Sequence, residues 1–195
     1  MAEFKSSGIF NATSELLGNH ASIRGEKVAI FYQDSSVTYK ELEQNVNRFA
    51  NVLKDLGINP KDRVMIVAPD SPEFVYAFLG SIKYGANPVP VNTMLTREDY
   101  NYLLADSGAR LLVTSTDSEA SLADTSDACQ RLYVDNDFVS LMNSASTIYD
   151  PYPAKQDDIA FWLYSSGSTG KPKGTPHKHI SLIFTADTYA KTILD

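Results

Sequence analysis

The chain has 195 residues, of which 43% are hydrophobic and 21% charged, a composition that excludes disorder for the bulk of the chain. Its net charge of −7 argues against a general nucleic-acid or anionic-membrane surface, although it leaves room for one small cationic site. The single cysteine excludes an internal disulfide, and no apolar run or signal peptide indicates export, so the sequence predicts an intracellular, cytoplasmic protein without a membrane span.

The N-terminal quarter predicts a hairpin that leads into a helix. Two apolar segments, residues 28–32 and 37–39, flank the turn residues 34–36. Thr38 and Glu41 have the spacing of a capping box, and the helical apolar pattern that follows ends at Gly57.

Strand and helix patterns then alternate along the chain. Strands are expected at residues 64–68, 88–91, 111–113 and 132–134, helices at 71–85 and 96–108, and a loop with a weak helix at 115–130. The segment 88–91 contains two prolines, which suit an edge or irregular strand rather than a central one. The alternation predicts an α/β fold with a largely parallel sheet flanked by helices.

Residues 143–158 have the composition of a connector, since they are rich in Ser, Asn and Pro. The sequence therefore predicts a first α/β portion over residues 1–142, a connector, and a last segment over residues 159–195. This last segment would hold a strand at 159–164, a glycine-rich loop and a following helix.

The loop after this strand has the highest concentration of residues that could bind a ligand. Its glycines let main-chain N–H groups approach a ligand, its hydroxyls can donate to oxygen atoms, and its lysines add positive charge. This combination favours an anion cradle over a flexible hydroxyl-rich turn, the simpler alternative. The candidate phosphate-binding residues are Ser165, Ser166, Gly167, Ser168, Thr169, Gly170, Lys171, Lys173 and Gly174.

The nucleotide-binding P-loop is the obvious comparison, and the sequence does not match it. That motif requires Gly, four residues, and then Gly-Lys-Ser/Thr. Here Gly170-Lys171 is followed by Pro172, and Ser165 stands where the first glycine would be.

The segment from Tyr164 to Gly174 instead resembles the phosphate-loop signature of the adenylate-forming superfamily, Tyr/Phe-Thr/Ser-Ser-Gly-Thr/Ser-Thr-Gly-x-Pro-Lys-Gly. That superfamily contains acyl- and aryl-CoA synthetases, peptide-synthetase adenylation domains and luciferases. Residues 37–42, 61–64 and 85–92 are similar to further landmarks of the superfamily, in the same order. The sequences of residues 10–13 and 161–168 are most similar to those of benzoate– and related aryl-CoA ligases.

The resemblance implies an ATP-dependent carboxylate–CoA ligase that forms an acyl-adenylate and pyrophosphate and then passes the acyl group to coenzyme A. ATP, Mg²⁺, coenzyme A and a small carboxylic acid would be its cofactors and substrates. The loop residues 165–174 would wrap the β- and γ-phosphates. The superfamily's later motifs would fall after Asp195, so the resemblance implies an N-terminal fragment of the large AMP-binding domain, with no complete catalytic set and inactive alone. A standalone non-catalytic nucleotide-binding or interaction domain and a fatty-acyl-CoA ligase remain open as alternatives.

Some residues near the loop have simpler interpretations. Pro176 lacks an N–H, so the sequence places the strand usually expected after the loop in doubt. His177 and His179 lack further ligands nearby, which favours structural roles and no metal site. Five aromatic residues at helical spacing are expected to make core and subdomain contacts: Tyr76, Phe78, Tyr84, Tyr100 and Tyr102.

Overall fold

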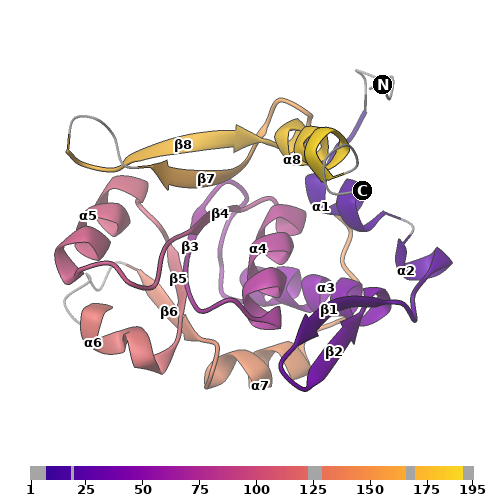
Figure 1. Cartoon of the computed structure of the whole chain (residues 1–195), viewed down its shortest axis with the longest axis horizontal. Coiled ribbons are helices and arrows are strands. Elements are labelled where there is room, and N and C mark those ends of the chain that lie inside the picture. Colours follow the sequence, from indigo (N-terminus) through magenta and orange to yellow (C-terminus); the bar gives the residue numbers. More distant parts are fainter. Residues whose placement is uncertain (1–7, 19, 123–128, 166–169, 191–195) are drawn as a thin grey trace.

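A four-stranded parallel sheet forms the centre of the computed structural model, which describes residues 8–18, 20–122, 129–165 and 170–190. Every neighbouring pair of its strands is parallel, and the chain alternates between these strands and helices, so the predicted α/β fold is confirmed (Figure 1). The strands, in sheet order, are β4 (Asn87–Pro90), β3 (Arg63–Val67), β5 (Leu111–Thr114) and β6 (Gln130–Tyr133).

Helices cover both faces of this sheet. Val64 and Ile66 of β3 belong to one apolar cluster, whereas Met65 and Val67 belong to another, as expected for side chains that alternate across a strand. The first cluster is covered by α3 (Tyr39–Asp55), α4 (Pro72–Tyr84) and α7 (Asp137–Ser144), and the second by α5 (Arg97–Ser107) and α6 (Glu119–Leu122).

The hairpin and the first long helix follow the prediction closely. Strands β1 (Val28–Tyr32) and β2 (Ser35–Thr38) pair antiparallel, and the capping box of Thr38 and Glu41 opens α3. The turn is shorter than predicted, because Gln33 adopts a φ of 51° and Ser35 already lies in β2.

The prolines of β4 lie where the sequence placed them. Because β4 is an edge strand of the four-stranded sheet, one side of its backbone needs no partner in that sheet, and Pro88 and Pro90 are tolerated. Ser71 caps α4, and Gly85 ends it with a φ of 97°.

The sequence analysis did not predict some of the helices. These are α1 (Ala12–Leu17) and α2 (His20–Ile23), together with the longer α7, whereas the weak helix expected at 115–130 corresponds to the 3₁₀ turn η1 (Thr116–Ser118) and α6. The spacing of Phe138, Leu141 and Met142 on α7 is a helical signal that could have been found. None of the described helices combines the length and apolarity needed to cross a bilayer.

The last described segment is an antiparallel hairpin of β7 (Ile159–Ser165) and β8 (Lys173–Lys178), followed by α8 (His179–Thr185) and the π-helical turn η2 (Ala186–Ala190). Figure 1 shows the hairpin lying across the end of the sheet, with β7 against β4. The doubt about a strand at Pro176 was wrong. Strand β8 pairs only with β7 among the described strands, so its other side is open and a residue without an N–H is accommodated.

Residues 145–158 form neither helix nor strand, yet they are tied to the core. Asn47 and Asn51 of α3 donate side-chain hydrogen bonds to the carbonyls of Thr147 and Ser146, and the N–H of Tyr152 donates to the carbonyl of Lys83. The division of the chain into subdomains at this segment stays a prediction.

Candidate phosphate-binding site

The glycine-rich loop connects the two strands of the β7–β8 hairpin. Ser165, the last residue of β7, pairs with Lys173, the first residue of β8, so the hairpin brings the two ends of the candidate site together. Four of the predicted site residues, Ser166, Gly167, Ser168 and Thr169, lie outside the described residues.

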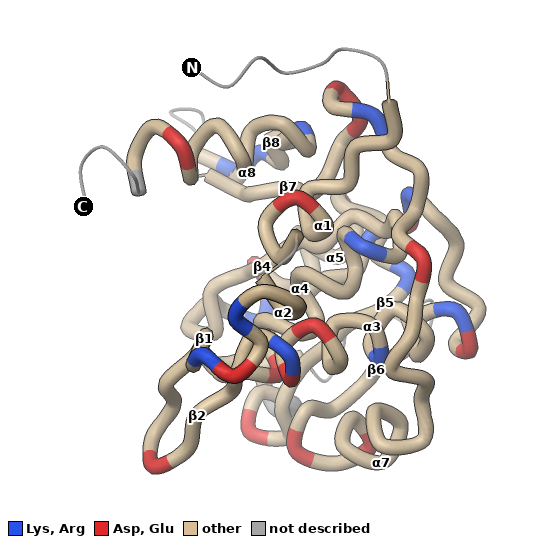
Figure 2. Tube along the Cα trace, turned by 90° about the vertical axis from the view of Figure 1, so that its right-hand side faces the viewer, with Lys and Arg blue, Asp and Glu red and all other residues tan. Residues whose placement is uncertain are grey.

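Both lysines of the loop are exposed. The ammonium nitrogen of Lys171 lies 5.0 Å from the centre of the Tyr102 ring, on α5. Lys173 lies at the start of β8, and Figure 2 shows basic positions near this hairpin at the upper end of the molecule. Two exposed ammonium groups beside a loop of hydroxyls can bind an anion with several oxygen atoms.

The two described glycines of the loop are needed for different reasons. Gly170 has a φ of 100°, a conformation that disfavours any side chain, although an added Cβ would meet no atom within 4 Å. A Cβ on Gly174 would lie 2.8 Å from Cε3 of Trp162 and 3.1 Å from Cζ of Tyr164. Gly174 is therefore required by packing against the opposite strand, which the sequence interpretation did not foresee.

Helix α5 contacts the loop on both sides. The hydroxyl of Tyr164, before the loop, donates a hydrogen bond to Oδ2 of Asp106 over 2.6 Å. The hydroxyl of Tyr102 donates to the carbonyl oxygen of Pro172, near the end of the loop, over 3.0 Å. Burial, together with the Asp106 carboxylate, raises the pKa of the Tyr164 hydroxyl, so Tyr164 stays a hydrogen-bond donor at neutral pH.

These α5 residues are the part of the site that sequence reasoning missed. Tyr102 was expected to make core and subdomain contacts, and it does pack against the second apolar cluster, but its bond to the loop was not predicted. Asp106 was not singled out. Their spacing of four residues places them on one face of a helix, but nothing local indicates that the face meets the loop.

The two histidines after the loop have packing roles. The ring of His177 stacks on Phe161 with centroids 4.7 Å apart and an interplanar angle of 11°. His179 is 3% exposed, and its Nδ1 accepts a hydrogen bond of 3.0 Å from the N–H of Ala12. Burial lowers the pKa of His179 to about 4, so the ring is neutral at physiological pH.

The described residues show no gathering of three or more His, Cys, Asp or Glu side chains that could hold a metal ion. The only cysteine, Cys129, is half-buried, and burial raises the pKa of its thiol to about 11. Its thiolate is therefore scarce at neutral pH, and the loop remains the candidate site.

Comparison with known proteins finds similar sequences over most of the chain. Residues 17–194 match the AMP-binding enzyme family. The benzoate–CoA ligase of Thauera aromatica is 40% identical over 195 residues, which cover 95% of this chain and 37% of that protein. The long-chain-fatty-acid–CoA ligase FadD13 of Mycobacterium tuberculosis is 33% identical over 166 residues, covering 82% of this chain and 33% of that protein.

The fold is likewise found in solved structures. The benzoate CoA ligase of Burkholderia xenovorans LB400 matches with a TM-score of 0.87 and 37% identity, over 95% of this chain and 38% of that one. The chain thus spans about a third of the length of these relatives. Because the family match covers most of the chain and the fold agrees, the chain belongs to the AMP-binding enzyme family.

Proposed function

We propose that this chain supplies the polyphosphate-binding segment of an ATP-dependent carboxylate–CoA ligase that acts on benzoate or a related aryl acid. The observation that carries the proposal is the loop between β7 and β8, with Lys171 and Lys173 exposed beside it, in a chain 40% identical to a benzoate–CoA ligase.

In the proposed reaction, the carboxylate of the acid attacks the α-phosphate of ATP, which gives an acyl-adenylate and releases pyrophosphate. The thiol of coenzyme A then attacks the acyl carbon and releases AMP. The loop, with its hydroxyls, N–H groups and lysines, would hold the β- and γ-phosphates and stabilise the negative charge that develops on the departing pyrophosphate.

The loop offers hydroxyl oxygens to Mg²⁺ but no carboxylate. Mg²⁺ is bound through oxygen ligands that include carboxylates, whereas residues 165–174 contain two lysines and neither Asp nor Glu. We therefore assign no step to Mg²⁺ through these residues.

A fatty acid is the second candidate substrate, supported by the FadD13 match at 33% identity. The aryl acid is preferred because the benzoate–CoA ligase match has higher identity and covers more of the chain. A standalone nucleotide-binding domain without activity is the other alternative.

A chimera tests the proposal. Residues 1–195 replace the matching segment of the Thauera aromatica benzoate–CoA ligase, and AMP production is measured with benzoate and with a long-chain fatty acid. Activity with benzoate is expected. A chimera that folds, binds coenzyme A and yet produces no AMP with either acid would contradict the proposal, and AMP production with the fatty acid alone would favour the second candidate.

The same chimera localises the role of the loop. Lys173→Ala should slow adenylate formation by roughly 10²–10³ while leaving CoA transfer from supplied benzoyl-adenylate unchanged, since the β- and γ-phosphates have gone by that step. Lys178→Ala is the matched control, because Lys178 lies at the other end of β8 and pairs with Asp157 at 2.7 Å. Equal losses in both half-reactions would show that Lys173 is structural.

A further inference from the structure

Helix α5 presents two polar side chains to the loop from one of its faces. Tyr102 and Asp106 are four residues apart, so they project from the same side of the helix. Tyr102 donates to the carbonyl of Pro172 and Asp106 accepts from Tyr164, so the two contacts hold the loop near its end and the residue just before its start.

The helix that makes these contacts is anchored in the core. The opposite side of α5 is packed into the core through Tyr100, Leu103 and Leu104, which are 0%, 1% and 9% exposed. The hydroxyl of Tyr100 also donates to the carbonyl of Asn92 over 2.9 Å, which ties the helix to the segment that precedes it. Because α5 is packed in this way, it can hold Tyr164 and Pro172 in fixed positions.

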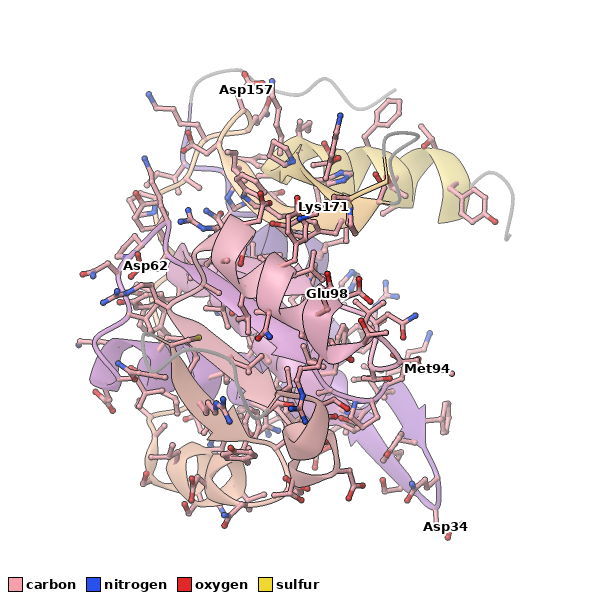
Figure 3. The ribbon with its side chains drawn as sticks, turned by 90° about the vertical axis from the view of Figure 1, so that its left-hand side faces the viewer. Asp34, Asp62, Met94, Glu98, Asp157 and Lys171 are labelled. Atoms are coloured by element: carbon pink, nitrogen blue, oxygen red, sulfur yellow. The ribbon has the colours of Figure 1, made fainter. Side chains whose placement is uncertain are left out.

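Lys171 is held by the same tyrosine. Its ammonium lies over the Tyr102 ring, and Figure 3 places Lys171 beside the hairpin and next to α5. An exposed cation–π contact is weaker than a charge-assisted hydrogen bond to a phosphate oxygen. When a polyphosphate binds, the Lys171 ammonium would therefore leave the Tyr102 ring and bind a phosphate oxygen.

We propose that Tyr102 and Asp106 are positioning residues that hold both ends of the phosphate loop on α5, and that the Tyr102 ring holds Lys171 until a polyphosphate binds. The coupling to a ligand rests on the phosphate-binding role proposed above for the loop, whereas the anchoring stands on the contacts themselves.

The negative charge of Asp106 allows its two possible effects to be distinguished, because they predict opposite changes in anion binding. Asp106 is an anionic group close to a site for anions, so its carboxylate by itself repels polyphosphate. If repulsion were its only effect, Asp106→Ala would strengthen anion binding. If Asp106 positions Tyr164 and the loop, the same substitution weakens binding.

The first experiment titrates the 195-residue chain with pyrophosphate by calorimetry at fixed ionic strength. Asp106→Ala and Tyr102→Phe should each raise the dissociation constant about 3- to 10-fold, the effect of one lost hydrogen bond. Glu98→Ala removes an exposed acid from the first turn of α5, labelled in Figure 3, which makes neither of the two loop contacts, and Tyr32→Phe removes a tyrosine hydroxyl from the β1–β2 hairpin. These two controls should stay within twofold of the unchanged chain. An unchanged or lower constant for Asp106→Ala would overturn the positioning role.

The second experiment measures the anchor without any ligand. Hydrogen exchange of the backbone amides at residues 170, 171, 173 and 174 should be about 10-fold faster in Asp106→Ala and Tyr102→Phe than in the controls. Equal exchange rates would overturn the anchor. If the unchanged chain binds no pyrophosphate while exchange still rises in the variants, the phosphate-binding role of the loop fails and the anchor survives.

The third measurement follows Lys171 directly. Its ε-methylene protons lie near an aromatic ring and should show an upfield NMR shift, assigned by its loss in Lys171→Arg. Saturating pyrophosphate should move this resonance to the ordinary lysine position. A resonance that pyrophosphate leaves in place would overturn the release of Lys171.

Discussion

At the scale of single residues, the two described loop glycines are required for different reasons. Gly170 is required by its backbone conformation, and Gly174 by the packing around it. Gly170→Ala should cost about 1–2 kcal/mol because its φ of 100° disfavours any side chain, although there is space for one. Gly174→Ala should cost about 1–3 kcal/mol because the new methyl group displaces the ring of Trp162. Urea denaturation measures both free energies of unfolding.

The emission spectrum of Trp162, the only tryptophan in the chain, distinguishes the two causes. It should change in Gly174→Ala and stay the same in Gly170→Ala. Gly8→Ala is the control, because a Cβ there meets nothing within 4 Å, and its effect should stay within about 0.5 kcal/mol. An unchanged Trp162 spectrum in Gly174→Ala would contradict the packing explanation.

His179 makes stability depend on pH. The pKa is about 4 in the folded chain against an ordinary value of 6.5, so the unfolded chain takes up the proton first as the pH falls. Stability should be constant above about pH 7 and should drop between about pH 6.5 and 4, by up to about 3 kcal/mol from this group.

Denaturation of the unchanged chain and of His179→Asn at several pH values checks this expectation. Asparagine can place an acceptor near the position of Nδ1, so the bond to the N–H of Ala12 can be kept without the titrating ring. The variant should lose less stability between pH 7 and 4.5, while the control His20→Asn should follow the unchanged chain. Parallel pH profiles for all three proteins would rule out a role for His179.

At the scale of the element, the capping box of α3 is the clearest local determinant. The Thr38 side chain accepts from the N–H of Glu41, and Glu41 accepts from the N–H of Thr38 over 2.8 Å. These bonds to Thr38 lower the pKa of Glu41. Because α3 covers one face of the sheet, Thr38→Ala should cost about 1 kcal/mol in the free energy of unfolding.

Thr185→Ala is the matched control for this substitution. The Thr185 hydroxyl only bonds back to the carbonyl of Ser181 within α8, so its removal should cost nothing measurable. Chemical denaturation compares the two variants. The same loss in both would mean that the threonine methyl or hydroxyl, rather than the cap, accounts for the effect at Thr38.

At the scale of the whole molecule, the β7–β8 hairpin and the segment after it expose apolar surface. Phe184 is 60% exposed and Tyr189 is 52% exposed, and β8 pairs only with β7 among the described strands, which leaves its other edge open. Open strand edges beside apolar side chains favour association between copies. We expect the 195-residue chain to self-associate as its concentration rises.

Sedimentation of two single variants tests where the association occurs. Phe184→Lys should shift the chain toward the monomer. Phe31→Lys replaces a phenylalanine that is 82% exposed on the β1–β2 hairpin, away from this surface in Figure 1, and should leave association unchanged. A monomeric chain at every concentration, or an equal response in both variants, would contradict the expectation.

The sequence by itself determined the features that depend on neighbouring residues. The strand–helix alternation, the capping box at Thr38 and the cap at Ser71 were predictable because each acts within a few residues along the chain. The edge position of β4 followed from Pro88 and Pro90. The family followed from the loop signature, although the roles of the individual loop residues stay proposals.

Only the tertiary structure decided which distant residues meet. The bond from Tyr164 to Asp106 spans 58 residues of chain, and that from Ala12 to His179 spans 167. No local pattern encodes such a pairing, because it depends on how β7 and α5 lie relative to the sheet. For the same reason the tolerance of Pro176 and the need for Gly174 became clear only once β8 was placed against Trp162.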